Sequence, residues 1–307
     1  MIRSTMNGWR LSRFLLAVGA ILIASMALAG SALAKEPTKG FSVFKQCPRF
    51  TPGVNFCLFG QVTGGEVTIG STTVPIEHTI TLQGGYEANE NTEPESFRFF
   101  GAVNGETLSK TPQNVPGGLL DLVNCKEIKG EGLLEKAARD SCEWVFENSV
   151  TGVKAVTELA KPASEIGINT NNLLNGEGTA LSLPVKIKLE NSLLGGECYI
   201  GSSSSPIVIP FTTGTTSPPP PNKPITGNVG KLNFLEEYKI IEITNNKLVE
   251  NAFAVPAATG CGGIFSFLID PIIDSKLGLP SAAGHNTAIQ TGTDKIATAK
   301  NVIASEM

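Results

Sequence analysis

The chain has 307 residues and a formal net charge of −4, with 41% hydrophobic and 17% charged residues. This length is sufficient to bury a large core, in one β domain or in two smaller ones. The mild excess of acidic side chains excludes binding that is driven by positive charge. We therefore expect neither a nucleic acid nor an anionic membrane as a partner.

The first 34 residues have the three parts of a secretory signal peptide. A basic start is followed by an apolar stretch over residues 14–29 and by a small-x-small cleavage site, Ala32-Leu33-Ala34. Cleavage after Ala34 leaves 21 basic and 28 acidic side chains, a net charge of −7. No later segment has the length and apolarity of a membrane span. The sequence predicts a protein that is secreted or held non-covalently in the cell envelope.

All six cysteines follow the predicted cleavage site, and an even number in an exported chain favours disulfides. Metal binding is less favoured, because the chain has two histidines and no C-x-x-C spacing. We expect no metal and no cofactor. The predicted pairs are Cys47 with Cys57, Cys125 with Cys142, and Cys198 with Cys261. The first two would close short local loops, and the third would join the repeat strand of the second half to the turn at residues 260–262.

An internal repeat is the clearest sign of organisation. Residues 64–76 (G-G-E-V-T-I-G-S-T-T-V-P-I) and 195–207 (G-G-E-C-Y-I-G-S-S-S-S-P-I) align without a gap and share eight of thirteen residues. The repeat predicts two related halves, residues 35–160 and 161–307, either as separate domains or integrated into one. It also predicts the same turn and strand geometry in both segments. Convergent composition of β-turns is the alternative explanation.

Alternating apolar and polar residues predict strands, most clearly over residues 74–83 and 181–190. Further strands are expected over residues 97–103, 207–213 and 238–244, between clusters of turn-forming residues. The sequence thus predicts a mainly β fold of antiparallel, sandwich- or barrel-like sheets, stabilised by disulfides.

Helices are expected to be few. Apolar residues recur at helical spacing over residues 132–146, which predicts an amphipathic helix with Cys142 on its buried side. A second, short helix is expected with Asp270 as N-cap, Pro271 at the first helical position and Gly278 at the end.

Three sets of residues are candidates for catalysis. His78 lies on the apolar side of the predicted strand 74–83, which favours a hydrogen-bonded core histidine over a general base. His285 lies in a predicted loop and is the better catalytic candidate, with Asp270 or Asp274 as weaker carboxylate candidates. No G-x-S-x-G elbow and no complete dinucleotide-binding glycine motif occurs. We therefore assign no catalytic residue from the sequence.

Several runs in the second half of the chain resemble uncharacterised secreted proteins of actinobacteria. They are P-V-K-I-K-L-E-N-S-L-L-G-G-E-C-Y-I-G (184–201), T-S-P-P-P-P-N-K-P-I-T-G (216–227), F-A-V-P-A-A-T-G-C-G (253–262) and G-L-P-S-A-A-G-H-N-T-A (278–288). The resemblance implies export, and no activity or functional residue comes with it.

Together these features predict a secreted, non-catalytic structural or binding protein of the cell surface or the extracellular space, with an unknown partner. The alternative is a secreted hydrolase that uses His285 with a carboxylate. That alternative requires His285 and an Asp or Glu to converge in one pocket.

Overall fold

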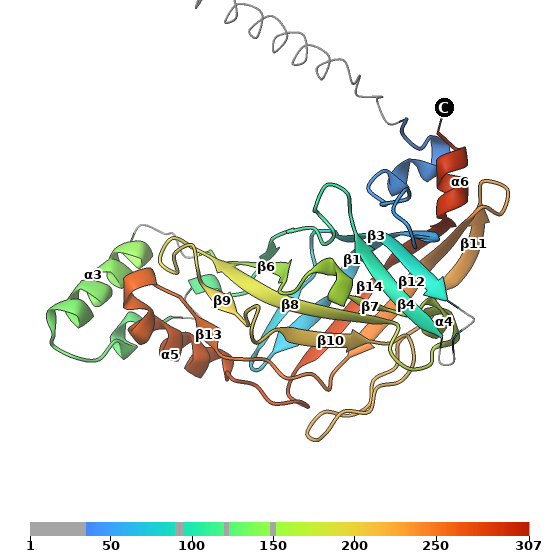
Figure 1. Cartoon of the computed structure of the whole chain (residues 1–307). Helices are drawn as coiled ribbons and strands as arrows, with labels where there is room; N and C mark the ends of the chain where they lie inside the picture. Colours follow the sequence, from blue (N-terminus) through green and yellow to red (C-terminus); the bar gives the residue numbers. More distant parts are fainter. Residues whose placement is uncertain (1–34, 90–91, 93–94, 120–122, 148–151, 307) are drawn as a thin grey trace, which may run out of the picture. The chain divides into compact units, whose positions relative to one another are not determined.

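The computed structural model describes residues 35–306, apart from 90–91, 93–94, 120–122 and 148–151. The predicted signal peptide, residues 1–34, lies outside the described residues. Within the unit formed by residues 37–306, two antiparallel sheets face each other (Figure 1). The prediction of a mainly β, sandwich-like fold is confirmed.

The first sheet has the strand order β11-β12-β14-β1-β3-β4, with β2 beside β1. Its strands are β1 (Phe56–Ile69), β2 (Thr72–Pro75), β3 (Ile80–Asn89), β4 (Ser96–Gly101), β11 (Lys231–Leu235), β12 (Ile240–Glu250) and β14 (Thr287–Thr298). Strands from the two ends of the described chain are therefore neighbours, since β14 pairs with β1 along almost its whole length.

The second sheet has the order β13-β9-β8-β6-β5, and β7 and β10 also pair with β8. Its strands are β5 (Gln113–Asn114), β6 (Lys154–Leu159), β7 (Gly167–Ile168), β8 (Leu181–Glu190), β9 (Tyr199–Ile200), β10 (Ile207–Phe211) and β13 (Ala258–Thr259). Both sheets contain strands from residues 35–160 and from residues 161–307, so neither predicted half forms a sheet of its own.

The helices lie at the ends of the sandwich, α3 and α5 at one end and α6 at the other (Figure 1). Their bounds are α3 (Leu133–Glu147), α4 (Thr170–Asn175), α5 (Ser266–Leu277) and α6 (Ala299–Ala304), with 3₁₀ helices η1 (Lys39–Phe44), η2 (Cys125–Glu127), η3 (Ala163–Glu165) and η4 (Gly263–Phe265). The predicted helix 132–146 is confirmed by α3. Among the described helices, none has the length and apolarity needed to span a bilayer.

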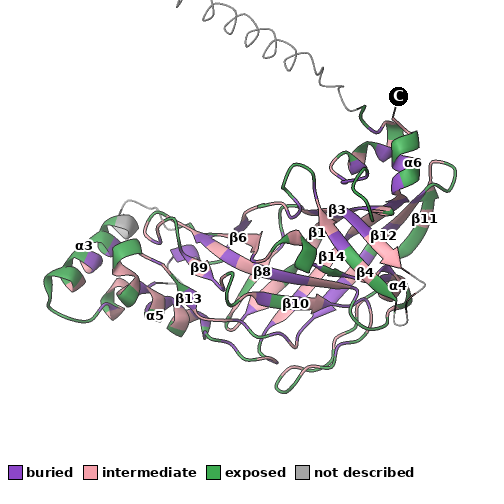
Figure 2. Cartoon of the chain, in the orientation of Figure 1, coloured by how far each residue is buried: buried purple, intermediate pink, exposed green. Residues whose placement is uncertain are grey.

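The main core lies between the two sheets. Alternate residues of each strand point inward, for example Leu58 of β1, Ile296 of β14 and Val185 of β8. A second, smaller core packs Phe41 and Phe44 of η1 against the first sheet. In Figure 2 the buried residues follow the central strands, whereas much of α3 is exposed.

All three predicted disulfides are confirmed. Cys47–Cys57, Cys125–Cys142 and Cys198–Cys261 are bonded, with Cα separations of 5.5, 5.7 and 4.1 Å. The third disulfide links the residue before β9 to the turn before η4, and both of its cysteines are completely buried.

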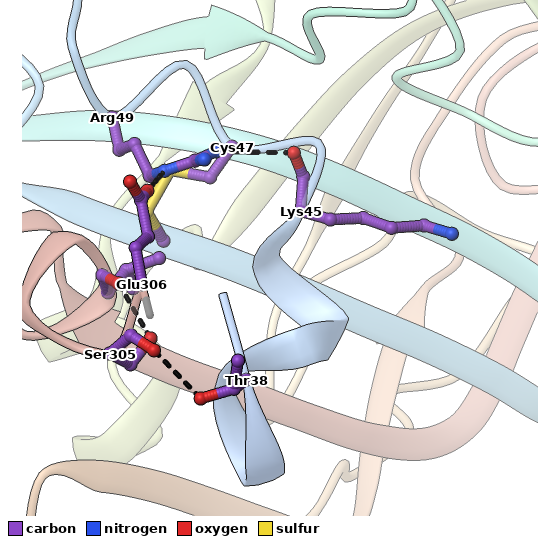
Figure 3. Close-up of polar contacts among 8 residues, drawn as sticks. Thr38, Lys45, Cys47, Arg49, Ser305 and Glu306 are labelled. Carbon is purple, nitrogen blue, oxygen red and sulfur yellow. Dashed lines mark hydrogen bonds and ion pairs between the residues drawn. A yellow bond between two sulfur atoms is a disulfide. The ribbon is translucent and has the colours of Figure 1, made fainter. Parts of the chain in front are cut away.

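Hydrogen bonds and an ion pair join the two ends of the unit (Figure 3). Thr38 Oγ1 donates to the carbonyl oxygen of Ser305 at 2.7 Å, and Pro37 forms a β-bridge with Glu306. Arg49 Nε forms an ion pair with Glu306 Oε1, and both side chains are almost fully buried. Arg49 also donates to the carbonyl oxygen of Lys45.

The prediction of one strand over residues 74–83 is wrong. β2 ends at Pro75 and β3 begins at Ile80, and the residues between them leave the sheet. Gln113 Oε1 accepts hydrogen bonds from the backbone N–H groups of Glu77 and His78, and Gln113 Nε2 donates to the His78 carbonyl. A distant side chain thus satisfies the backbone in place of a strand partner. His78 is exposed, so the prediction of a core histidine is also wrong.

The predicted second helix ends at Gly278 as expected but begins earlier, at Ser266. Asp270 is therefore inside α5 rather than at its N-cap. Its carboxylate accepts hydrogen bonds from the backbone N–H groups of Gly260 and Cys261, which precede the helix. Pro271 also lies inside the helix, where its missing N–H leaves one carbonyl of the first turns without an intrahelical partner.

The repeated segments do not share the predicted geometry. In residues 64–76, the end of β1 folds back on β2 as a hairpin. In residues 195–207, β9 and β10 both pair with β8 and not with each other. The shared residues specify turns, whereas the pairing partner depends on the sheet in which each segment lies.

Candidate binding site between the sheets

The sequence-predicted candidates do not come together. His285 is exposed in the loop before β14. Within the described part of the chain, no hydrogen bond or ion pair joins the His285 side chain to a carboxylate. The constellation that a hydrolase based on His285 would require is therefore not seen in the described residues.

Asp270 and Asp274 have structural contacts instead. The Asp270 carboxylate accepts from Cys261 N at 2.7 Å and from Gly260 N at 3.0 Å, and Asp274 Oδ1 accepts from Ala258 N at 2.7 Å. Burial raises the pKa of both carboxyls, and these hydrogen bonds oppose the rise. Both side chains attach β13 and the Cys261 turn to α5.

An apolar cavity of about 70 Å³ lies between the sheets. Eleven of its fourteen lining residues are apolar, including Ile69 of β1 and Ile187 and Leu189 of β8. Val74 and Ala155, on opposite sheets, are partly exposed and place the cavity next to solvent. Small-molecule sites share this apolar lining, although they are typically several times larger, about 300 Å³ or more. We call it the apolar cavity.

A second cavity of about 40 Å³ adjoins it, and Ile80 lines both. It contains polar side chains that face the interior of the sandwich: Asp294 and Gln290 of β14 and Asn246 of β12. Asp294 is on the same side of β14 as the core residue Ile296, since side chains two apart share a face. We call this space the polar cavity.

The Asp294 carboxyl has one occupied and one open oxygen. Asn246 Nδ2 donates to Asp294 Oδ2. Asp294 Oδ1 accepts no hydrogen bond from the described residues and lies above Gly60, where a Cβ would be only 2.5 Å from it. A glycine at position 60 therefore makes the room that this oxygen needs. Among the described residues, Asn251 Oδ1 and not Asp294 Oδ1 is the buried side-chain atom without a partner, so this oxygen keeps some contact with solvent.

Two β-bulges flank this site. The pairing of β14 shifts register between Val62 and Gly64 on β1, and between Thr244 and Asn246 on β12. Both irregularities lie opposite Gly292, where a Cβ would be 2.0 Å from the Gln61 carbonyl oxygen. β-bulges redirect side chains and are frequent beside functional sites. Here one of them turns Asn246 towards Asp294.

Burial raises the pKa of Asp294 to about 6, and the hydrogen bond from Asn246 opposes the rise. No lysine, arginine or histidine is among the described residues that line the polar cavity. The folded chain therefore keeps an acidic group inside the sandwich without a cation to balance it. Such an arrangement is expected to reduce stability at neutral pH.

We expect the Asp294→Asn variant to be more stable than the wild type by about 2 kcal/mol at pH 7. Because the folded pKa, about 6, lies above the ordinary value of 3.8, the proton binds more tightly to the folded chain. The stability from Asp294 is complete below about pH 4 and is lost as the pH rises through about 6. The difference between the two pKa values corresponds to about 3 kcal/mol, and the partial exposure of the Asp294 side chain reduces this energy.

Urea unfolding of both proteins between pH 4 and pH 8 checks this expectation. Asp140→Asn, on the exposed face of α3, is the matched control and should change the pH dependence little. A variant at position 294 that is less stable than the wild type at pH 7 would show that the ionised carboxyl is a net stabilising group.

A third, more open hollow of about 540 Å³ lies between α3 and residues 262–265, with Trp144 and Phe265 in its wall. Its openness leaves a ligand largely in solvent, so it is the weaker candidate.

Asp294, Asn246 and Gln290 are not among the candidates predicted from the sequence. One signal was present: in β14 the face shared by Ala288 and Ile296 also carries Gln290 and Asp294. Comparison of the chain with protein-family models, curated proteins and solved structures found no match.

Proposed function

We propose that this protein is an exported, non-catalytic binding protein that holds a small apolar ligand between its two sheets. The apolar cavity is the observation that carries the proposal, because its lining offers van der Waals contacts and almost no hydrogen-bonding groups. Gln113 is one of its three polar residues, and its side-chain amide already bonds to residues 77 and 78. The three disulfides support export, since they persist in oxidising compartments.

The size of the cavity limits the ligand to a short apolar group. At about 70 Å³ it is smaller than the cavity of roughly 150 Å³ that holds benzene in an engineered protein core. It therefore encloses only a short segment of an unbranched alkyl chain. No charged side chain is among the described residues of the lining, so the chain itself needs no charge.

Ethyl methyl ether is a suitable first probe, because it is a short alkyl chain without a hydrogen-bond donor and is smaller than benzene. We expect it to bind the mature chain in isothermal titration calorimetry with a negative heat-capacity change, the mark of apolar burial. Ala155→Phe should weaken binding at least about tenfold, because the ring occupies the cavity. Ala137→Phe, on the exposed face of α3, makes the same chemical change away from the site and should not alter the affinity.

The melting temperature of each variant shows whether it is folded. Thr157→Phe places a ring in the same cavity from the next inward position of β6 and serves if Ala155→Phe does not fold. Equal affinity of wild type, Ala155→Phe and Thr157→Phe for the ether would reject the apolar cavity as the binding site.

A further inference from the structure

The open hollow beside α3 is a large space that the function proposed above does not use. Its volume of about 540 Å³ is within the range of small-molecule sites, roughly 300–1,000 Å³. One wall is a face of α3 that carries Asp140, Ser141 and Trp144, since helix positions three and four apart lie side by side. Residues of the segments 192–195 and 262–265 form the rest of the lining.

Both walls of this hollow are held in place by the fold. The disulfide at Cys142 and two hydrogen bonds from Arg139 attach α3 to the segment that precedes it. In the other wall, the backbone N–H of Gly262 donates to the carbonyl oxygen of Leu194 at 2.8 Å. A ligand would therefore enter a preformed space, which reduces the entropy lost on binding.

Two aromatic rings line the hollow. The Trp144 side chain of α3 is 59% exposed, whereas Phe265 is partly buried and packs against the main core. The face of an aromatic ring carries partial negative charge and attracts a cation, most strongly when the ring is tryptophan. The rings also offer apolar contact to methyl groups.

The charged side chains of the hollow favour a cation as well. Asp140 is exposed in its wall, and no lysine, arginine or histidine is among the described residues of the lining. The neighbouring Arg139 instead donates to the carbonyl oxygens of Ile128 and Gly130, at 2.7 and 3.0 Å. The Asp140 carboxylate therefore attracts a cation in the hollow and repels an anion.

We propose that this hollow is a second binding site, separate from the apolar cavity, and that it binds a methylated ammonium group such as the trimethylammonium group of choline. The methyl groups contact the rings of Trp144 and Phe265, and the Asp140 carboxylate balances the charge. A primary ammonium ion is more strongly hydrated and gains less from an apolar wall. Free choline and the phosphatidylcholine headgroup carry the same trimethylammonium group, so the test includes both sources.

The first experiment compares three ligands of similar shape and different charge: choline, 3,3-dimethyl-1-butanol and 3,3-dimethylbutanoate. Trp144 is the single tryptophan of the mature chain, since Trp9 lies in the predicted signal peptide, so tryptophan fluorescence reports directly on this site. We expect choline to bind at least about fivefold more tightly than the neutral alcohol, and the carboxylate to bind more weakly than the alcohol. Equal affinities for choline and the alcohol would overturn the proposal.

The second experiment measures choline binding to variants of the mature chain by calorimetry. Trp144→Leu should weaken binding at least about threefold, and Trp144→Phe should weaken it less because a ring is retained. Phe267→Leu is the matched control, because it removes a ring of α5 that is 54% exposed and lies outside the lining. It should leave the affinity unchanged.

The role of the carboxylate has its own pair of variants. Asp140→Asn should weaken choline binding about threefold and leave the affinity for the alcohol unchanged. Glu143→Gln removes an exposed carboxylate of α3 outside the lining and should change neither affinity. The melting temperature of each variant shows whether it is folded. Wild-type affinity for choline in both Trp144→Leu and Asp140→Asn would overturn the proposal.

Vesicle cosedimentation distinguishes the two sources of the trimethylammonium group. Binding to phosphatidylcholine vesicles and not to phosphatidylglycerol vesicles assigns a lipid headgroup as the ligand. Binding of choline without binding to either vesicle assigns a free trimethylammonium compound. Binding to phosphatidylglycerol vesicles alone, which present no trimethylammonium group, would overturn the proposal.

Discussion

Replacing Cys198 and Cys261 together by alanine is expected to lower the free energy of unfolding by about 4 kcal/mol. This disulfide closes the longest loop of the three, with a sequence separation of 63. A crosslink restricts the unfolded chain, and this restriction increases with the logarithm of loop length. The bond also attaches the β9 segment to the Cys261 turn, which Asp270 anchors to α5. Loss of the crosslink therefore releases the β9 segment from the Cys261 turn, which packs against α5.

The matched comparison is the Cys47→Ala, Cys57→Ala double variant. Its loop separation is 10, and the same relation predicts a loss of about 3 kcal/mol. Urea unfolding under non-reducing conditions measures both differences, and reduction of the wild type gives an independent reference. A larger loss for the short loop than for the long loop would contradict the chain-entropy explanation.

Replacing Arg49 by methionine is expected to lower the free energy of unfolding by about 3 kcal/mol. Arg49 and Glu306 form an ion pair whose side chains are 7% and 10% exposed. Removal of one partner leaves the other charge buried without compensation, which is much more costly than loss of an exposed pair. The pair also closes the contact between the first and last segments of the unit, so α6 should become less protected from hydrogen exchange.

Two control variants distinguish the loss of a buried ion pair from the loss of an exposed one. The double variant Arg49→Met, Glu306→Leu should recover most of the loss, because an apolar pair of similar volume avoids the buried charge. Lys239→Met breaks an exposed pair with Glu237, 52% and 90% exposed, and should cost less than about 0.5 kcal/mol. If Arg49→Met and Lys239→Met have equal effects, the Arg49 pair is not a buried contact in solution.

Predictions from local patterns agreed best with the structure. The strand over residues 181–190 is β8 with the same bounds, because its alternation reflects one fully buried face. The helix over residues 132–146 is α3, whose apolar residues have helical spacing. The two short-range disulfides followed from closure of local loops.

Predictions failed where a distant residue supplied the backbone partner. The apolar alternation of residues 74–83 continues through Glu77 and His78, but Gln113 binds their backbone and ends the strand. Asp270 has the sequence context of an N-cap, yet its carboxylate accepts hydrogen bonds from the backbone N–H groups of Gly260 and Cys261. The repeated turns share glycines, whereas their strand partners differ. None of these contacts can be read from a local window.

By itself, the sequence determined the fold class, the disulfide pairs and the positions of β8 and α3, since these depend on periodicity and on cysteine spacing. Only the tertiary structure decided the candidate site. Gly60, Asn246 and Asp294 belong to β1, β12 and β14, and sheet pairing makes these strands neighbours although β1 and β14 are separated by more than half the chain. The position of the Asp294 carboxyl above Gly60, beside Asn246 and next to a cavity, is visible only in the folded chain.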